Sequence, residues 1–181
     1  MKQILDHSLD TPTWIHLSGN SGTGKSELIQ LTSENVPFVF RFDCKLWIDS
    51  KYFFTRLADT YFPSCKKLSL NSLKGAIAQY LIKEQKRRYN LYLILDHLDW
   101  MPADEINSFL LPLLKLAHLP IGLNGTSRIC IITVSNKQSI GLPFSKLDLY
   151  FSEYERPLID QIVLEKLGNL KLPYLKNLVS V

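Results

Sequence analysis

Short runs of apolar residues alternate along the chain with longer stretches in which apolar residues recur at helical spacing. The apolar runs predict five β-strands, over 13–17, 37–43, 91–96, 129–134 and 147–151. The helical spacing predicts helices over 27–31, 48–59, 70–85, 102–118 and 155–167. Strands that alternate with helices are typical of a parallel sheet covered on both faces. We therefore expect a three-layer α/β domain with a five-stranded, mostly parallel sheet in the middle.

The composition is that of an ordinary globular chain. Of its 181 residues, 46% are hydrophobic and 21% are charged, which suffices for the core of one α/β domain and a fragment of a second. The net charge of +4 permits contact with nucleic acid without indicating it. Three widely spaced cysteines, Cys44, Cys65 and Cys130, favour free thiols in a reducing compartment. Because no signal-peptide core or membrane-spanning apolar stretch is present, we expect a soluble, intracellular protein.

The first candidate site is a glycine-rich segment between the first predicted strand and the first predicted helix. It has the pattern Gly-x-x-x-x-Gly-Lys-Ser of nucleotide-binding phosphate loops, and its residues are Gly19, Asn20, Ser21, Gly22, Thr23, Gly24, Lys25 and Ser26. Glycines let backbone N–H groups approach phosphate oxygens, and the N-terminus of the next helix offers further N–H groups. Lys25 is expected to bind the β- and γ-phosphates, and the Ser26 hydroxyl to hold Mg²⁺. The alternative is a glycine-rich turn without a ligand.

The second candidate is Asp96, which ends the apolar run that forms the third predicted strand. All strands of a parallel sheet open their carboxyl ends on one edge, so Asp96 is expected beside Ser26. Its carboxylate is expected to hold Mg²⁺ through water. A strand-end cap is the alternative, because many strands end in aspartate. The pairing with the phosphate loop favours the metal role.

The residues after Asp96 indicate that the candidate site hydrolyses its nucleotide weakly. In ATPases of the AAA+ class, this aspartate is followed by a glutamate that polarises the attacking water. Here the next residue is His97, to which we assign no active role, and Asp99 is three residues away with a shorter side chain. The sequence therefore predicts a site that binds nucleotide well and hydrolyses it poorly, and no residue is assigned as catalytic.

Polar residues also follow the fourth predicted strand, which ends at Val134. Ser135 and Asn136 stand at its tip, between the two signatures of the site. Ser135 is the candidate for reaching the γ-phosphate of a bound nucleotide. An ordinary polar turn is an equally open interpretation.

Taken together, these residues resemble the AAA+ domain of subunit five of the eukaryotic origin recognition complex, over nearly the whole chain. The segments that carry the resemblance are 19–26, 91–99, 104–116, 131–135 and 149–154, with Phe42-Asp43-Cys44 before an aromatic-rich helix. The phosphate loop alone is shared with many families. More specific are Asp96 and Asp99 without an adjacent glutamate, and the corner Tyr150-Phe151-Ser152-Glu153-Tyr154.

The resemblance implies a P-loop NTPase with an AAA+, RecA-like core over 1–165. The segment 166–181 is expected to be a C-terminal tail or the start of a truncated helical lid. The implied protein binds ATP with Mg²⁺, hydrolyses it slowly or not at all, and uses it to stabilise assembly on replication-origin DNA. Its implied partners are the other subunits of the complex in a partial hetero-ring, and origin DNA through that complex, in the nucleus. No membrane contact is expected.

One feature departs from this family. A neighbour-facing arginine is expected between the tip after Val134 and the last strand, but only Lys137 and Lys146 are positively charged there. Two other functions stay open: another AAA+ ring ATPase, such as a clamp-loader-like subunit or a signalling switch, and a P-loop kinase that transfers a phosphoryl group. A kinase needs an acceptor pocket and an arginine-rich lid, and no arginine cluster follows Asp96.

Overall fold

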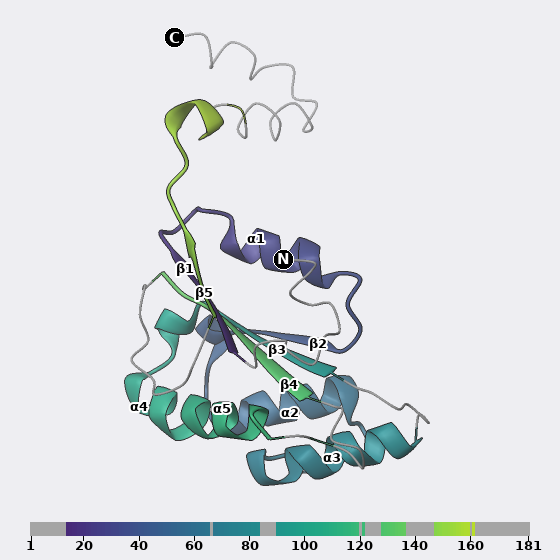
Figure 1. Ribbon diagram of the computed structural model, residues 1–181. Coiled ribbons are helices and arrows are strands. Elements are labelled where there is room, and N and C mark those ends of the chain that lie inside the picture. The colour runs from purple at the N-terminus through teal and green to yellow at the C-terminus, as the bar shows by residue number, and fades with distance from the viewer. Residues whose placement is uncertain are drawn as a thin grey trace, which may run out of the picture. The chain divides into compact units, whose positions relative to one another are not determined.

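The computed structural model describes residues 14–65, 67–83, 90–119, 121, 128–136, 147–159 and 161. Its centre is a five-stranded sheet in the order β2-β3-β4-β1-β5, and every neighbouring pair is parallel (Figure 1). The strands are β1 (Trp14–Gly19), β2 (Val39–Asp43), β3 (Asn90–Asp96), β4 (Arg128–Val134) and β5 (Leu147–Phe151). The predicted five-stranded parallel sheet is confirmed.

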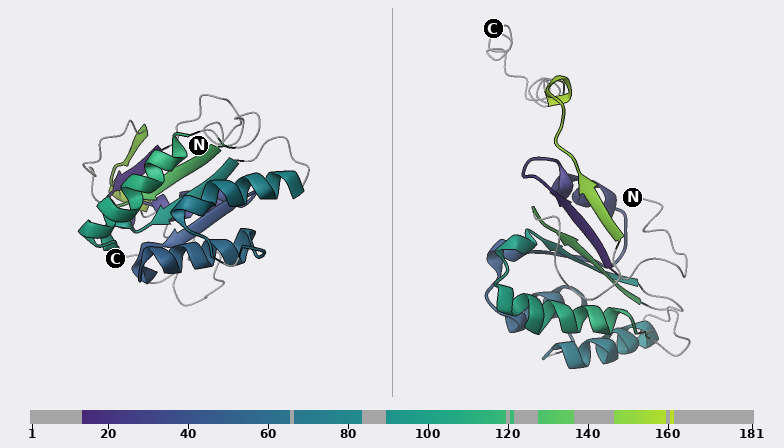
Figure 2. Two further views of the ribbon diagram at one scale, coloured as in Figure 1. Left: turned by 90° about the horizontal axis from the view of Figure 1, so that it is seen from below. Right: turned by 60° about the vertical axis from the view of Figure 1, so that its left-hand side comes forward.

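Helices cover both faces of this sheet, which confirms the predicted three layers (Figures 1 and 2). Helix α1 lies on one face, and α2, α3 and α5 lie on the other. Their bounds are α1 (Lys25–Ser33), α2 (Ser50–Tyr61), α3 (Leu70–Lys83) and α5 (Leu111–Ala117). The predicted helix starting at residue 27 begins two residues earlier, and the one starting at residue 48 begins two residues later.

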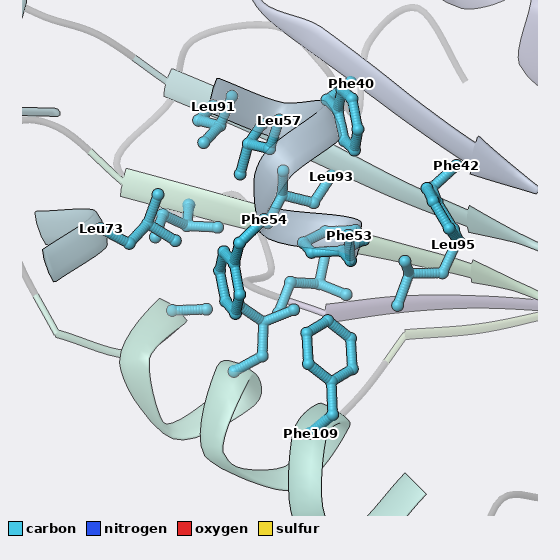
Figure 3. Close-up of a cluster of buried hydrophobic side chains, with 14 of the residues drawn as sticks. Phe40, Phe42, Phe53, Phe54, Leu57, Leu73, Leu91, Leu93, Leu95 and Phe109 are labelled. Carbon is cyan, nitrogen blue, oxygen red and sulfur yellow. The ribbon is translucent and has the colours of Figure 1, made fainter. Parts of the chain in front are cut away.

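Two apolar cores hold these layers together, because successive side chains of a strand point to opposite faces. Leu91, Leu93 and Leu95 of β3 belong to the larger core, under α2, α3 and α5. Tyr92 and Ile94 belong to the smaller core on the α1 face. Figure 3 shows the larger core, in which the three leucines lie together with aromatic rings from β2 and α2.

The helix predicted over 102–118 is not a single regular helix. It consists of a short turn, α4 (Ala103–Glu105), a π-helical turn (Ile106–Leu110) and α5. Pro112 explains the wide turn: its ring lacks an N–H and clashes with the carbonyl four residues earlier, at Ser108. A π-turn moves the hydrogen bonding to i→i−5, and the Leu111 N–H accordingly donates to the Ile106 carbonyl.

The chain divides into a unit that ends at Phe151 and a second unit that begins at Ser152. Several predicted features lie outside the described residues: most of the helix over 155–167, most of the loop over 119–127, Lys137, Lys146 and the boundary at residue 165. Among the described helices, none has the length and apolarity needed to cross a bilayer.

The prediction of free thiols is confirmed for Cys44, Cys65 and Cys130. Burial raises the pKa of Cys44 and of Cys130 to about 12, so both are protonated at neutral pH. These two cysteines act as small apolar core residues.

Candidate functional site

The phosphate-loop segment connects β1 to α1 at the carboxyl edge of the sheet, and two of its glycines are required by geometry. Gly19 pairs with Phe151 of β5, and a Cβ at this position would collide with the Phe151 carbonyl oxygen. Gly24 precedes α1 with a φ of 79°, a left-handed conformation that favours glycine. The segment therefore turns sharply enough for α1 to begin at Lys25.

The Lys25 ammonium lies inside this loop. Its Nζ donates hydrogen bonds to the carbonyl oxygens of Gly19 and Asn20, both at 2.7 Å. It also lies 3.3 Å from Thr23 Oγ1 and from Asn136 Oδ1. Burial lowers the pKa of Lys25, and the negative charges of Asp99 and Asp96 oppose that shift. The loop thus holds a cation where a phosphate group would arrive.

The structure brings Ser26 and Asp96 together, as the sequence predicts. Ser26 Oγ donates to Asp96 Oδ1 at 3.0 Å, and the His97 backbone N–H donates to the same oxygen at 2.9 Å. The Asp96 side chain is only 1% exposed. Its other oxygen, Oδ2, accepts a hydrogen bond of 2.6 Å from Arg41 Nη2 of β2, an ion pair that the sequence analysis did not find.

A second set of contacts joins the end of β4 to the turn after β3. The backbone N–H of Asn136 donates to Asp99 Oδ1 at 2.7 Å, and its Nδ2 donates to Asp99 Oδ2 at 3.1 Å. Burial alone raises the pKa of Asp99, but hydrogen bonds from the Ser135 side chain and the Asn136 backbone outweigh it, so the pKa is lowered. Asp99 is therefore an ionised, fully engaged carboxylate at neutral pH.

His97 has an unusual backbone. Its φ is 55° and its ψ is 46°, a left-handed conformation that is uncommon outside glycine. Its ring nitrogen Nδ1 lies 3.0 Å from Asp43 Oδ1 and 3.7 Å from Asp96 Oδ1. The ring therefore packs against the end of β2 at the rim of the site.

Most of these groups line a cavity of about 470 Å³. Its walls come from the loop, the ends of β3 and β4, and the short helical turns after β2 and β3; they include Ser21–Glu27, Lys45, Asp96, His97, Asp99, Trp100 and Val134–Asn136. Lys45 Nζ lies 5.9 Å from the centre of the Trp100 ring. The volume falls within the range of small-ligand pockets, about 300–1,000 Å³.

The chemistry of the cavity fits a nucleoside triphosphate. A helix N-terminus and a lysine ammonium suit phosphate oxygens. The Ser26 hydroxyl supplies a hard oxygen donor of the kind that Mg²⁺ prefers.

Of the residues that the sequence predicted, Ser21–Ser26 of the loop, Asp96 and Ser135 line the cavity, and Gly19 and Asn20 of the loop do not. Sequence reasoning did not assign Asn136, which contacts both Lys25 and Asp99, and it placed Asp99 outside the working site although Asp99 lines the cavity. The signal for Asn136 was present, because it follows Ser135 at a polar strand end. Arg41 could also have been singled out from the sequence, because it is the one charged residue in the predicted strand over 37–43 before the terminal Asp43.

No protein-family model matches the sequence, and no curated protein matches it. Among solved structures, the chain is similar to a Walker-type ATPase of Pyrococcus abyssi (TM-score 0.66, 14% identity, covering 98% of this chain and 59% of that one). It is also similar to a chain of the Drosophila ORC bound to DNA (TM-score 0.66, 17% identity, 91% and 44% covered). A third similar structure is the ORC2 protein of Aeropyrum pernix in ADPNP–ADP complexes (TM-score 0.62, 16% identity, 88% and 46% covered).

These likenesses show the fold, which is that of the AAA+ P-loop NTPases, as predicted. This chain spans between 44% and 59% of the length of the three similar chains.

Proposed function

We propose that this protein is an ATP-binding subunit of an origin recognition complex, equivalent to subunit five. In this role ATP stabilises assembly with neighbouring subunits on origin DNA in the nucleus, and it is hydrolysed slowly or not at all. The observation that carries the nucleotide-binding part is the convergence of Lys25, Ser26 and Asp96 on one cavity at the carboxyl edge of the sheet.

Each residue of this convergence has a defined role toward ATP. Lys25 exchanges its bonds to the Gly19 and Asn20 carbonyls for bonds to the β- and γ-phosphates. Ser26 is an oxygen ligand available to Mg²⁺, whose chemistry is to neutralise phosphate charge, and Asp96 holds the Ser26 hydroxyl in place. Asn136 holds Asp99 in place and lies beside Lys25, where it can donate to the γ-phosphate.

The geometry also supports slow hydrolysis. Position 97 carries an imidazole that faces Asp43 instead of a carboxylate directed at a water molecule. Both oxygens of Asp99 accept hydrogen bonds from Asn136, and its lowered pKa makes it a weak base. Attack by water on the γ-phosphate therefore lacks an efficient proton acceptor.

The origin-complex role rests on the sequence resemblance and is supported by the likeness to a chain of the Drosophila ORC. Another AAA+ ring ATPase is equally consistent with the fold, because the likeness to the Pyrococcus Walker-type ATPase has the same TM-score. For a phosphoryl-transfer kinase we find no support: the described residues that line the cavity include two lysines and no arginine.

Affinity purification of the tagged full chain from its source cells, followed by identification of the partners, tests the assigned complex. We expect other origin-complex subunits to co-purify, and a fluorescent fusion to concentrate in the nucleus. Co-purification with a sliding clamp or with a signalling receptor, and without origin-complex subunits, would instead support another AAA+ ATPase.

ATP is expected to raise the melting temperature. At a ligand concentration about a hundredfold above Kd, binding adds about 2.7 kcal/mol to the free energy of unfolding. For a chain of this size, that is roughly 5–10 °C in Tm. The measurement is a calorimetric melt with ATP and Mg²⁺, with MgCl₂ alone as control. A folded chain whose melt does not move with millimolar ATP would count against a working site.

The isolated chain is expected to release almost no phosphate from ATP, and His97→Glu is expected to raise the rate about tenfold or more, because a well-placed base contributes roughly 10²–10⁴. Histidine and glutamate both have a Cβ, so the left-handed conformation of position 97 is strained in the wild type and in the variant alike. Steady-state phosphate release measures the effect, and His97→Gln, which adds no charge, is the matched control. Rapid turnover by the wild type that Asp99→Asn abolishes would show that Asp99 is the base.

A further inference from the structure

We propose that Arg41 is a built-in counter-cation for Asp96. The Arg41 guanidinium takes the place of Mg²⁺ on this carboxylate, and nucleotide binding is therefore nearly independent of divalent cations. The inference rests on the proposed nucleotide-binding function. It changes the role predicted for Asp96 from metal ligand to partner of a guanidinium.

The contacts of Asp96 leave little room for a metal ion. Arg41 Nη2 donates to Oδ2 at 2.6 Å, a short, charge-assisted hydrogen bond. Ser26 Oγ and the His97 N–H both donate to Oδ1. With the side chain 1% exposed, both oxygens already have partners inside the protein. A cation that binds Asp96 must displace one of them or share the carboxylate with Arg41.

The sheet register positions Arg41 for this contact. On the neighbouring strands β2 and β3, Arg41 pairs with Ile94, and Asp43 pairs with Asp96. Arg41 and Asp43 are two residues apart on β2, so both side chains lie on the same sheet face. Phe40 and Phe42 point to the opposite face, into the larger core. The Arg41 side chain is 35% exposed, so it spans from solvent to a buried carboxylate.

The charge of Arg41 is permanent, because a guanidinium does not lose its proton in proteins. A divalent cation on Asp96 would be repelled by this charge at short range, and the repulsion is strong in a partly buried site. Without Arg41, Asp96 would be a buried carboxylate with two hydrogen bonds and no direct ion pair to a guanidinium or ammonium group. Arg41 supplies the missing positive charge in the absence of metal.

A purely structural ion pair would stabilise the fold without affecting metal binding, so the test measures metal binding directly. Mn²⁺ serves as an observable substitute for Mg²⁺, and its free concentration is followed by electron paramagnetic resonance in nucleotide-free protein. We expect wild type to bind Mn²⁺ weakly, and Arg41→Gln to bind it about tenfold more tightly because the competing charge is gone. Arg41→Lys keeps the charge and should behave as wild type. The double variant Arg41→Gln/Asp96→Asn should lose the gain. Equal Mn²⁺ affinity in wild type and Arg41→Gln would overturn the inference.

A second arm measures the Kd of a fluorescent ATP analogue with Mg²⁺ and with EDTA. In wild type the two values should agree within about threefold, while in Arg41→Gln they should differ by about tenfold or more. A wild-type affinity that falls more than tenfold in EDTA would overturn the inference, even if Arg41→Gln fails to fold. Should wild type bind no nucleotide in either buffer, the proposed function fails, and the Mn²⁺ arm still decides the role of Arg41.

Discussion

Replacement of Lys25 by alanine is expected to abolish measurable ATP binding. In the nucleotide-free protein, the ammonium is held by the Gly19 and Asn20 carbonyls inside the loop. On binding it is directed at phosphate oxygens, and each charge-assisted hydrogen bond contributes about 1.5–3 kcal/mol. Loss of one such bond lowers the affinity roughly tenfold to a hundredfold, and Lys25 is positioned to make more than one. Fluorescence anisotropy with a labelled ATP analogue measures the loss.

The matched control is Lys115→Ala, which removes an exposed lysine of α5 without touching the cavity. It should bind the analogue as wild type does, and both variants should melt cooperatively. A folded Lys25→Ala protein with wild-type affinity would mean that nucleotide, if bound, lies elsewhere than in the loop.

Replacement of Phe53 by alanine is expected to lower the free energy of unfolding by about 3–5 kcal/mol, because the lost ring leaves a cavity in a tightly packed core. Phe53 of α2 is fully buried at the centre of the larger core (Figure 3). Its ring centroid lies 4.9 Å from that of Phe109, 5.3 Å from those of Phe42 and Phe54, and 5.5 Å from that of Phe40. The loss thus weakens the contact of α2 with the sheet and with the π-turn before α5.

Urea denaturation followed by circular dichroism measures this change. Ile82→Ala, at a largely exposed position of α3, is the control and should change the free energy of unfolding by no more than about 0.5 kcal/mol. A Phe53→Ala protein as stable as wild type would show that the larger core is packed differently.

The elements of the fold were predictable because the sequence pattern and the burial agree. The residues of β3 and β4 form almost continuous apolar runs, as expected for strands covered on both faces, and both are buried nearly throughout. The contact of Ser26 with Asp96 also followed from the sequence, since strand ends of a parallel sheet share one edge. The conformation of the phosphate loop was predictable from its glycines, because these residues adopt positive φ angles.

Other features depend on which strands become neighbours, and a single sequence does not state that order. Arg41 reaches Asp96 only because β2 pairs with β3 in a register that aligns Asp43 with Asp96. Asn136 meets Asp99 because the ends of β4 and β3 are adjacent. The π-turn has a local cause, because Pro112 lies inside the helix instead of ending it and cannot take part in regular α-helical hydrogen bonding. The contacts of Arg41 and Asn136 are long-range side-chain effects, which periodicity does not encode.

The most direct test of the nucleotide site is a ¹⁵N–¹H NMR titration of the full chain with ATP, which reports on each backbone amide. We predict that the shifted amides cluster in residues 19–26, with further shifts at Asp96, His97 and Asn136, which lie in or beside the same cavity. A second cavity, of about 410 Å³, lies between the end of α2 and α3 and is lined by Tyr61, Cys65 and Tyr80. Shifts confined to that cavity, or no shifts at saturating ATP in a well-dispersed spectrum, would contradict the assignment of the loop as the ATP site.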